Sequence, residues 1–225
     1  MCGRFVTPTA EDLWTNFQVK VPDSYKQSFN CAPTQMIPAL SSPHELLFLR
    51  WGLIPSWAKD ASIGNRMINA RAETLQIKPS FKQALMRRRC VIPAQGFYEW
   101  KLVGKQKQPF YIFHTDGSLL CFAGLWESWK SPEGKMIQSA SVITQEATGA
   151  IQSLHSRMPV VLNSADISSW LSPQTSTQEI SRLLNQSEPG EITIHAVSTQ
   201  VNSPRFDSRQ CIEPLRNSAL SETTP

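Results

Sequence analysis

The chain begins MCGRF, so a cysteine directly follows the initiator methionine. Removal of Met1 is favoured when the second residue is small, and it would leave Cys2 with a free α-amine beside its thiol. The amine has an ordinary pKa of about 7.7–8.0, and the thiol one of about 8.5, which we expect the ammonium and Arg4 to lower. Such a group condenses with aldehydes to a thiazolidine, or its thiolate attacks acyl groups. The alternative is a small residue placed there by chance.

A second polar motif, INARAET at 68–74, alternates Asn69, Arg71 and Glu73 with two alanines. In an extended strand these three polar side chains share one face. An amide and a guanidinium on one face can hold an oxyanion or a phosphate. The competing interpretation is a solvent-facing strand edge.

Two further motifs supply candidate acid/base groups. In GFYEW, Glu99 stands among aromatic residues, where desolvation would raise its pKa into the range of general acid/base catalysis. In LHSRMP, His155 precedes Arg157, and Pro159 favours an extended backbone at Met158. An exposed strand glutamate and a structural histidine are the simpler alternatives.

Tryptophan and arginine motifs leave the choice between core and surface open. In WGLIPSW, Trp51 and Trp57 are either core residues or platforms on which unpaired bases stack. The arginines at 87–89 are either a solvated helix end or contacts to phosphates.

Composition limits the class of protein. The 225 residues suffice for one large or two small domains, and 40% hydrophobic content with 9% aromatics supports a real core. The net charge of +4 permits a nucleic-acid surface without requiring one. An apolar run of about 18 residues is absent, which argues against a membrane-spanning or secreted protein.

Cysteine and histidine usage argues against disulfides and metal. The five cysteines are odd in number and widely spaced without a CxxC pair, and the four histidines are scattered singly. We therefore predict a protein of the reducing cytoplasm with neither a metal nor another cofactor.

Strand patterns dominate the chain, and no βαβ alternation or linker is present. Helices are expected at 9–17 with Thr9 as cap, 79–89 with Ser80 as cap, 147–154, 164–171 and 178–187. Strands are expected at 29–40 and 45–57, at sheet edges because of their prolines, and at 90–102, 108–115, 119–129, 140–147, 158–162 and 192–199. The polar tail 216–225 is predicted to be disordered. The sequence thus predicts one α+β domain over 1–225, built on a mostly antiparallel, barrel-like sheet.

Taken together, these motifs resemble one family. MCGRF, FNCAP, WGLIPSW, INARAET, GFYEW, HSRMP and STQVN are similar, in this order, to the signature blocks of the SOS-response-associated peptidase (SRAP) family. The resemblance extends from Cys2 to about Leu215. Its one departure is Phe29, where a tyrosine is common.

The resemblance implies a function and a set of site residues. It implies a domain that binds single-stranded DNA and links its N-terminal cysteine covalently to the aldehyde of an abasic site. Cys2 would then be the nucleophile, Asn69 would steady the sugar-derived end, and Glu99 and His155 would form the acid/base pair. DNA contacts are assigned to Arg4, Asn30, Pro33, Trp51, Trp57, Arg71, Trp100 and Arg157.

Two other functions stay open at this stage. Cys2 could serve as the N-terminal nucleophile of an (auto)peptidase, as the family name records, or be incidental in a non-catalytic DNA-binding module. We expect a monomer without membrane association, located in the cytoplasm and associated with the nucleoid during DNA damage. The expected partner is single-stranded DNA that contains abasic sites.

Overall fold

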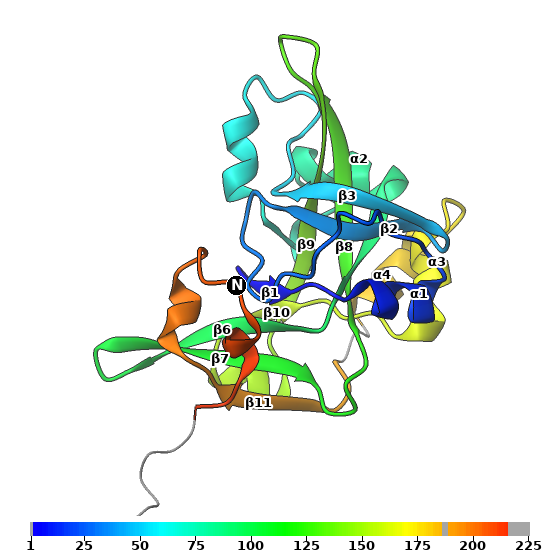
Figure 1. Cartoon of the computed structure of the whole chain (residues 1–225). Coiled ribbons are helices and arrows are strands. Elements are labelled where there is room, and N and C mark those ends of the chain that lie inside the picture. Colours follow the sequence, from blue (N-terminus) through cyan, green and yellow to red (C-terminus); the bar gives the residue numbers. More distant parts are fainter. Residues whose placement is uncertain (1, 186–188, 216–225) are drawn as a thin grey trace, which may run out of the picture.

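The computed structural model describes residues 2–185 and 189–215, and its centre is a closed β-barrel (Figure 1). Its five strands pair in the circular order β9-β3-β2-β5-β8. They are β2 (Met36–Ser42), β3 (Glu45–Trp51), β5 (Arg89–Ala94), β8 (Leu120–Lys130) and β9 (Met136–Glu146). Every pair is antiparallel except β3 with β9. The predicted α+β fold with a barrel-like, mostly antiparallel sheet is confirmed.

Interlocking aromatic rings fill one end of the barrel. Phe5 packs edge to face against Trp51 and Phe122, with ring centroids 5.0 and 6.1 Å apart, and Phe97 meets Phe122 at 5.9 Å. Such edge-to-face pairs add to the free energy gained by burying the rings. Because Phe5 belongs to the N-terminal strand β1 (Phe5–Val6), this packing fixes the chain three residues after Cys2.

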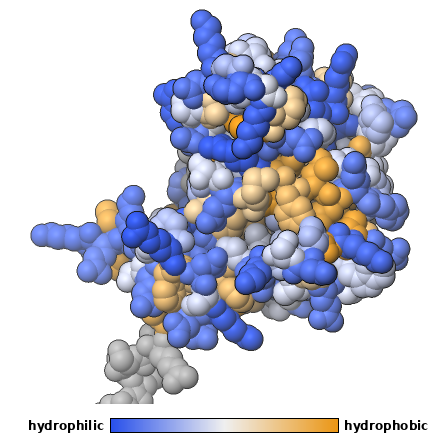
Figure 2. Space-filling view, turned by 45° about the horizontal axis from the view of Figure 1, so that its top comes forward, coloured by the Kyte–Doolittle hydropathy of each residue, from blue (hydrophilic) through white to orange (hydrophobic). Residues whose placement is uncertain are grey.

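A second sheet, in the order β1-β6-β7-β11, lies against the barrel. It contains β6 (Gly96–Val103), β7 (Gln106–His114) and β11 (Ile192–Ala196). β6 and β7 form the predicted hairpin, whose turn contains Gly104 at a φ of 61°, in the left-handed region that glycine tolerates. The hairpin projects from the body in Figure 1, and Figure 2 shows mostly hydrophilic side chains on this projection. Leu102 and Val103 near its turn are exposed apolar residues.

The helices are short and lie outside the sheets. Helix α1 (Ala10–Phe17) has Thr9 as its N-cap, as the sequence predicts, and the structure adds a reciprocal capping box between Thr9 and Asp12. The others are α2 (Pro79–Arg87), α3 (Ile167–Leu171) and α4 (Thr177–Asn185), and 3₁₀ segments occur at 61–66, 72–74, 149–153, 164–166, 199–202 and 209–212. No helix in the described part of the chain is long and apolar enough to cross a membrane. Residues 186–187 and the predicted disordered tail 216–225 lie outside the described residues.

Two local predictions are wrong. Lys78 rather than Ser80 is the N-cap of α2, because Pro79 occupies the first helical position, where its missing N–H costs nothing. β2 and β3 are not edge strands, since each has neighbours on both sides. Pro38 is tolerated within β2 because β5 pairs with β2 only at Leu40, so Pro38 lies where only β3 is bonded.

The arginine run at the end of α2 is structural at two of its positions. Buried Arg89 donates to the carbonyls of Trp170 and Leu85, at 2.6 and 2.7 Å, and so ties α2 and α3 to the barrel. Arg88 forms a 2.6 Å ion pair with buried Glu127. Neither guanidinium is available to follow a phosphate backbone.

The two tryptophans of WGLIPSW should differ sharply in their effect on stability. Trp51 is fully buried and its indole N–H donates to the Ile68 carbonyl at 2.9 Å, whereas Trp57 is 58% exposed. Trp51→Ala should lower the free energy of unfolding by about 3–5 kcal/mol. Trp57→Ala should change it by less than about 0.5 kcal/mol. Urea unfolding of both variants measures the difference, and equal losses would contradict the burial described here.

Candidate active site

The end of strand β9 beyond the barrel organises the site. There β9 pairs with β4 (Asn69–Arg71) in parallel and with β10 (Arg157–Pro159) in antiparallel orientation. Both short strands pair with Thr144, so they flank β9 on opposite sides. This arrangement brings the INARAET and LHSRMP motifs, more than eighty positions apart in the sequence, to one place. Glu73 does not share a strand face with Asn69 and Arg71, in contrast to the sequence-based prediction. The chain leaves β4 after Arg71 and turns into a 3₁₀ segment at Ala72–Thr74.

Cys2 lies at the centre of these motifs and is held by Asn69. The Asn69 side-chain Nδ2 donates to the Cys2 carbonyl at 2.8 Å, and the Cys2 Sγ lies 3.8 Å from the Arg4 carbonyl. Burial raises the pKa of the Cys2 thiol far above its ordinary value, and the charge of Glu99 raises it further. The expectation of a lowered thiol pKa is therefore wrong for this state, because desolvation outweighs the nearby positive charges.

The Oδ1 atom of the Asn69 side chain can accept a hydrogen bond from a further partner. Donation to a carbonyl fixes the amide orientation, since only the NH₂ group can donate. The Oδ1 atom is then a buried acceptor, and it has no hydrogen-bond partner among the described residues. A buried acceptor without a partner carries a free-energy cost that a bound donor would remove. Asn69 can thus hold Cys2 and a bound molecule at the same time.

Glu99 is the buried carboxyl group of the site. Strand β6 carries it inward, and only 2% of the residue is exposed. Burial raises the pKa of Glu99, while the ammonium at the start of the chain and His155 oppose this shift. The direction agrees with the sequence-based expectation. A buried carboxyl group with a raised pKa beside a reactive side chain is a candidate for general acid/base catalysis.

His155 stands at the start of the turn into β10. Its Nδ1 atom accepts a hydrogen bond of 2.9 Å from the backbone N–H of Arg157. The same Nδ1 atom also lies 3.2 Å from the carbonyl oxygen of Arg157. Both contacts are with the backbone of Arg157, which therefore holds the ring in a defined orientation.

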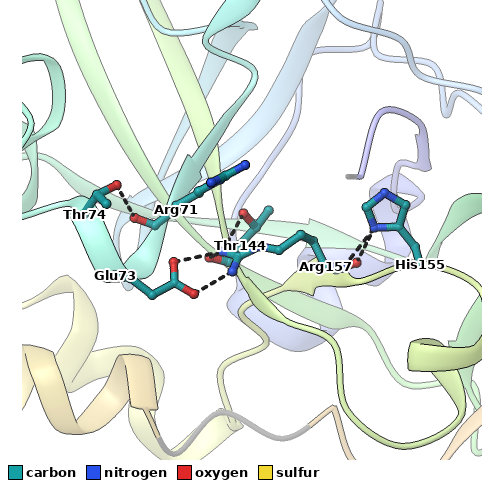
Figure 3. A network of polar contacts seen from close by, with 6 residues as sticks. All are labelled: Arg71, Glu73, Thr74, Thr144, His155 and Arg157. Atoms are coloured by element: carbon teal, nitrogen blue, oxygen red, sulfur yellow. Dashed lines mark hydrogen bonds and ion pairs between the residues drawn. The ribbon is translucent and has the colours of Figure 1, made fainter.

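Arg71 and Arg157 play different parts around Glu73 (Figure 3). The Arg157 guanidinium forms a two-pronged ion pair with Glu73 at 2.5 and 3.0 Å and also donates to the Thr144 carbonyl at 2.6 Å. Figure 3 shows the exposed Arg71 side chain pointing away from this pair. Its guanidinium makes no hydrogen bond within the described part of the chain. Arg71 is the cation that remains available to a ligand.

Two residues assigned to DNA contact instead hold the C-terminal segment. Asn30 is fully buried, and its Nδ2 donates to the carbonyls of Val201, Ser203 and Phe206 at 2.8–3.1 Å. Its Oδ1 accepts from Arg4 at 2.6 Å. DNA contact by the Asn30 side chain is thus wrong. Arg4 also donates to the Val201 and Asn202 carbonyls, at 3.0 and 3.3 Å, which secures the chain beside Cys2.

The aromatic and proline residues assigned to DNA contact differ in burial. Trp51 belongs to the core, so its assignment as a base-stacking platform is wrong. Trp57 is exposed and Pro33 is half-buried. Half-buried Trp100 follows Glu99 on β6, and its indole N–H donates to the Asn202 Oδ1 at 2.6 Å. DNA contact by these three residues stays a prediction.

Sequence reasoning missed two contributors. Thr144 pairs with both flanking strands and accepts from Arg157, but it lies in an apolar strand pattern without any motif around it. The ion-pairing role of Glu73 was missed because its partner is distant in the sequence. No local signal identifies either contact.

This fold and site define a barrel protein in which a buried cysteine at position 2 is bonded to an amide and lies near a buried carboxyl group, which in turn interacts with an imidazole. Residues 1–204 match the model of the family described as SOS response associated peptidase (SRAP). The chain belongs to this family.

Similar proteins support the assignment. The Bacillus subtilis "Abasic site processing protein YoqW" is 41% identical over 95% of this chain and 99% of that protein. The rat "Abasic site processing protein HMCES" is 32% identical over 88% of this chain and 67% of that protein. A crystal structure of a Bacteroides thetaiotaomicron protein, 24% identical, has the same fold, with a TM-score of 0.82 over 94% of this chain and all of that one.

The raised pKa of Glu99 predicts how Glu99→Gln alters stability with pH. Because the folded pKa lies above the unfolded one, the carboxyl favours folding below its unfolded pKa, and that advantage disappears as pH rises through the folded pKa. The Tm of the Gln variant minus that of wild type should therefore increase from pH 4 to pH 8, by about 2–4 °C for each kcal/mol. Calorimetry at both pH values tests this, and a difference that decreases would mean that the carboxylate stabilises the fold.

Proposed function

We propose that this protein binds single-stranded DNA and links Cys2 covalently to the aldehyde of an abasic site. The observation that carries the proposal is the placement of Asn69 and Glu99 beside Cys2, with His155 close enough to Glu99 to influence its pKa. The names of the bacterial and mammalian relatives support abasic-site processing. The protein acts as a single-domain monomer in the cytoplasm, without a cofactor.

The first step opens the sugar ring. An abasic deoxyribose is mostly a closed hemiacetal, so its aldehyde must be released before any adduct can form. A base removes the proton from the C1′ hydroxyl, the C1′–O4′ bond breaks, and an acid protonates O4′. Glu99 and His155 are the base and acid for this exchange, which typically gains about 10²–10⁴-fold from such groups.

The second step joins the protein to the sugar. The free amine of Cys2 attacks C1′, and loss of one water gives an imine. The Cys2 sulfur then adds to the same carbon while its proton passes to the nitrogen, which closes the thiazolidine ring. The net reaction consumes one aldehyde and one aminothiol and releases one water.

The buried state of Cys2 favours this order of bond formation. A thiol held neutral by burial is a weak nucleophile, so the amine attacks first. Glu99 is close enough to affect the pKa of the Cys2 thiol. It can therefore accept the thiol proton after the imine has formed. The Oδ1 atom of Asn69 offers an acceptor for a hydroxyl or ammonium at the same centre.

Four exposed or half-buried residues provide the contacts to DNA. Arg71 continues the strand that begins with Asn69, and its free guanidinium suits a phosphate. Trp57 presents an indole face on which a neighbouring base can stack, worth about 1–3 kcal/mol. Trp100 directly follows Glu99 in the GFYEW motif, and Pro33 lies in the FNCAP motif with Asn30. Both are further contacts to DNA in this proposal.

A peptidase activity is the second candidate, because the description of the matching family contains that word. The same Cys2 would then attack an amide carbonyl, with its own amine as base. Intact mass spectrometry after mixing with abasic single-stranded DNA separates the functions: an adduct of protein plus DNA minus one water supports the proposal, and a shortened peptide supports the alternative.

DNA affinity should depend on Arg71 rather than on Cys2. Arg71→Ala should weaken binding to undamaged single-stranded DNA, whereas Cys2→Ala should leave it nearly unchanged, because the nucleophile meets only the lesion. Affinity should decrease with salt, with a slope of about 0.7 for each phosphate contact, and Arg71→Ala should reduce that slope. Fluorescence titration of a labelled oligonucleotide at two salt concentrations measures both. Salt-independent affinities that are equal for the two variants would contradict the assignment.

Crosslinking should require the amine of Cys2 as much as its sulfur. A thiazolidine contains both atoms, whereas a thiol alone gives a reversible hemithioacetal and an amine alone gives an imine that hydrolyses or lets the strand break. A form with an uncleavable extension before Cys2 should therefore bind DNA but form no heat-stable adduct.

Methionine-free protein and the Cys2→Ala variant serve as the positive and negative controls. Denaturing gels and intact mass with an abasic oligonucleotide measure the yield. A stable adduct of full yield from the extended form would rule out the thiazolidine and indicate attack by another residue.

A further inference from the structure

Glu73 is connected to His155 by an unbroken chain of contacts (Figure 3). Its two carboxylate oxygens hold the Arg157 guanidinium at 2.5 and 3.0 Å. The same guanidinium is anchored on the Thr144 carbonyl at 2.6 Å. The backbone N–H of Arg157 then donates to the Nδ1 of His155 at 2.9 Å.

We propose that Glu73 is a positioning residue that acts through Arg157 to fix the orientation of His155, and that withholds Arg157 from DNA. The inference rests on the proposed function, because His155 acts there as an acid/base group.

The burial of the pair supports a positioning role. The Arg157 side chain is only 12% exposed, whereas the Glu73 side chain is 49% exposed. An arginine that serves mainly as a phosphate contact needs an accessible fork, but here a carboxylate and a carbonyl occupy it. The backbone of Arg157 is thereby held at β10, and the N–H that it presents to His155 keeps a fixed direction.

The charge of Glu73 supports the inference that this residue withholds Arg157 from DNA. Arg71 and Arg157 both lie close enough to lower the pKa of Glu73, with the hydrogen bond from Arg157 as the largest cause. Glu73 is therefore ionised at neutral pH and cancels one of these two positive charges. Without it, a second guanidinium would be free beside Arg71.

The positioning of His155 and the withholding of Arg157 from DNA predict opposite effects of Glu73→Gln on crosslinking rate and on DNA affinity. Crosslinking to abasic DNA should slow about 3- to 10-fold, less than the roughly 10²-fold or greater loss expected when an acid/base group itself is removed. Affinity for undamaged single-stranded DNA should stay the same or rise, and the salt slope should steepen by about 0.7 because Arg157 gains a phosphate contact. A purely structural role, or direct DNA binding by the pair, would lower both rate and affinity.

A readout independent of the reaction tests the link to His155. Amide hydrogen exchange measured by NMR should accelerate at Arg157 in Glu73→Gln, because its N–H no longer has a fixed direction toward the imidazole. The matched control is Glu179→Gln, which removes another two-pronged arginine pair, with Arg182 on helix α4 at 2.9 and 2.6 Å. That control should change neither the crosslinking rate nor the exchange of the Arg157 amide.

The outcomes separate this inference from the proposed function. Unchanged Arg157 exchange together with wild-type crosslinking in Glu73→Gln would overturn the inference. A parallel loss of rate and DNA affinity would overturn it as well. Wild-type protein that forms no adduct would instead overturn the proposed function, while the exchange measurement would still report on the positioning chain.

Discussion

The site depends on one strand that continues past the barrel it helps to close. At Thr144, β9 has left its barrel partners and pairs with β4 on one side and β10 on the other. Backbone hydrogen bonds in a ladder leave little freedom, so side chains on the flanking strands inherit fixed positions. Asn69 and Arg157 are therefore placed by the backbone of β9, and the groups that they hold, Cys2 and His155, are placed indirectly.

Two kinds of electrostatic environment meet within this small region. Toward the barrel, Cys2 and Glu99 are buried, and burial favours the neutral form of each. Toward solvent, Glu73 and Arg157 form a fully charged pair, and Arg71 remains exposed. In the proposed function, proton exchange would take place in the inner part and phosphate contact in the outer part. His155 stands between them, since it influences Glu99 and is bonded to the backbone of Arg157.

Sequence motifs predict candidate reactive groups because each has an unusual residue type in a short, distinctive context, and the structure brings Asn69 and Glu99 to Cys2. The motifs could not show which of two tryptophans, six positions apart in one motif, is buried. Trp51 is buried and Trp57 is exposed. Local preference contains no information about which side of a loop meets the core. The same limit explains Asn30, whose three carbonyl partners lie about 170 residues away. Closure of the barrel through the parallel β3–β9 pair also follows from long-range contacts alone.

The burial of Cys2 has a consequence for the lifetime of the protein before it meets a substrate. Peroxide and other oxidants attack the thiolate, so a thiol that is buried and neutral is oxidised slowly. Under the proposed function, the thiol would thus be kept in its unreactive form until an aldehyde binds. The same side-chain environment would then set both the resistance of Cys2 to oxidation and its reactivity toward the aldehyde.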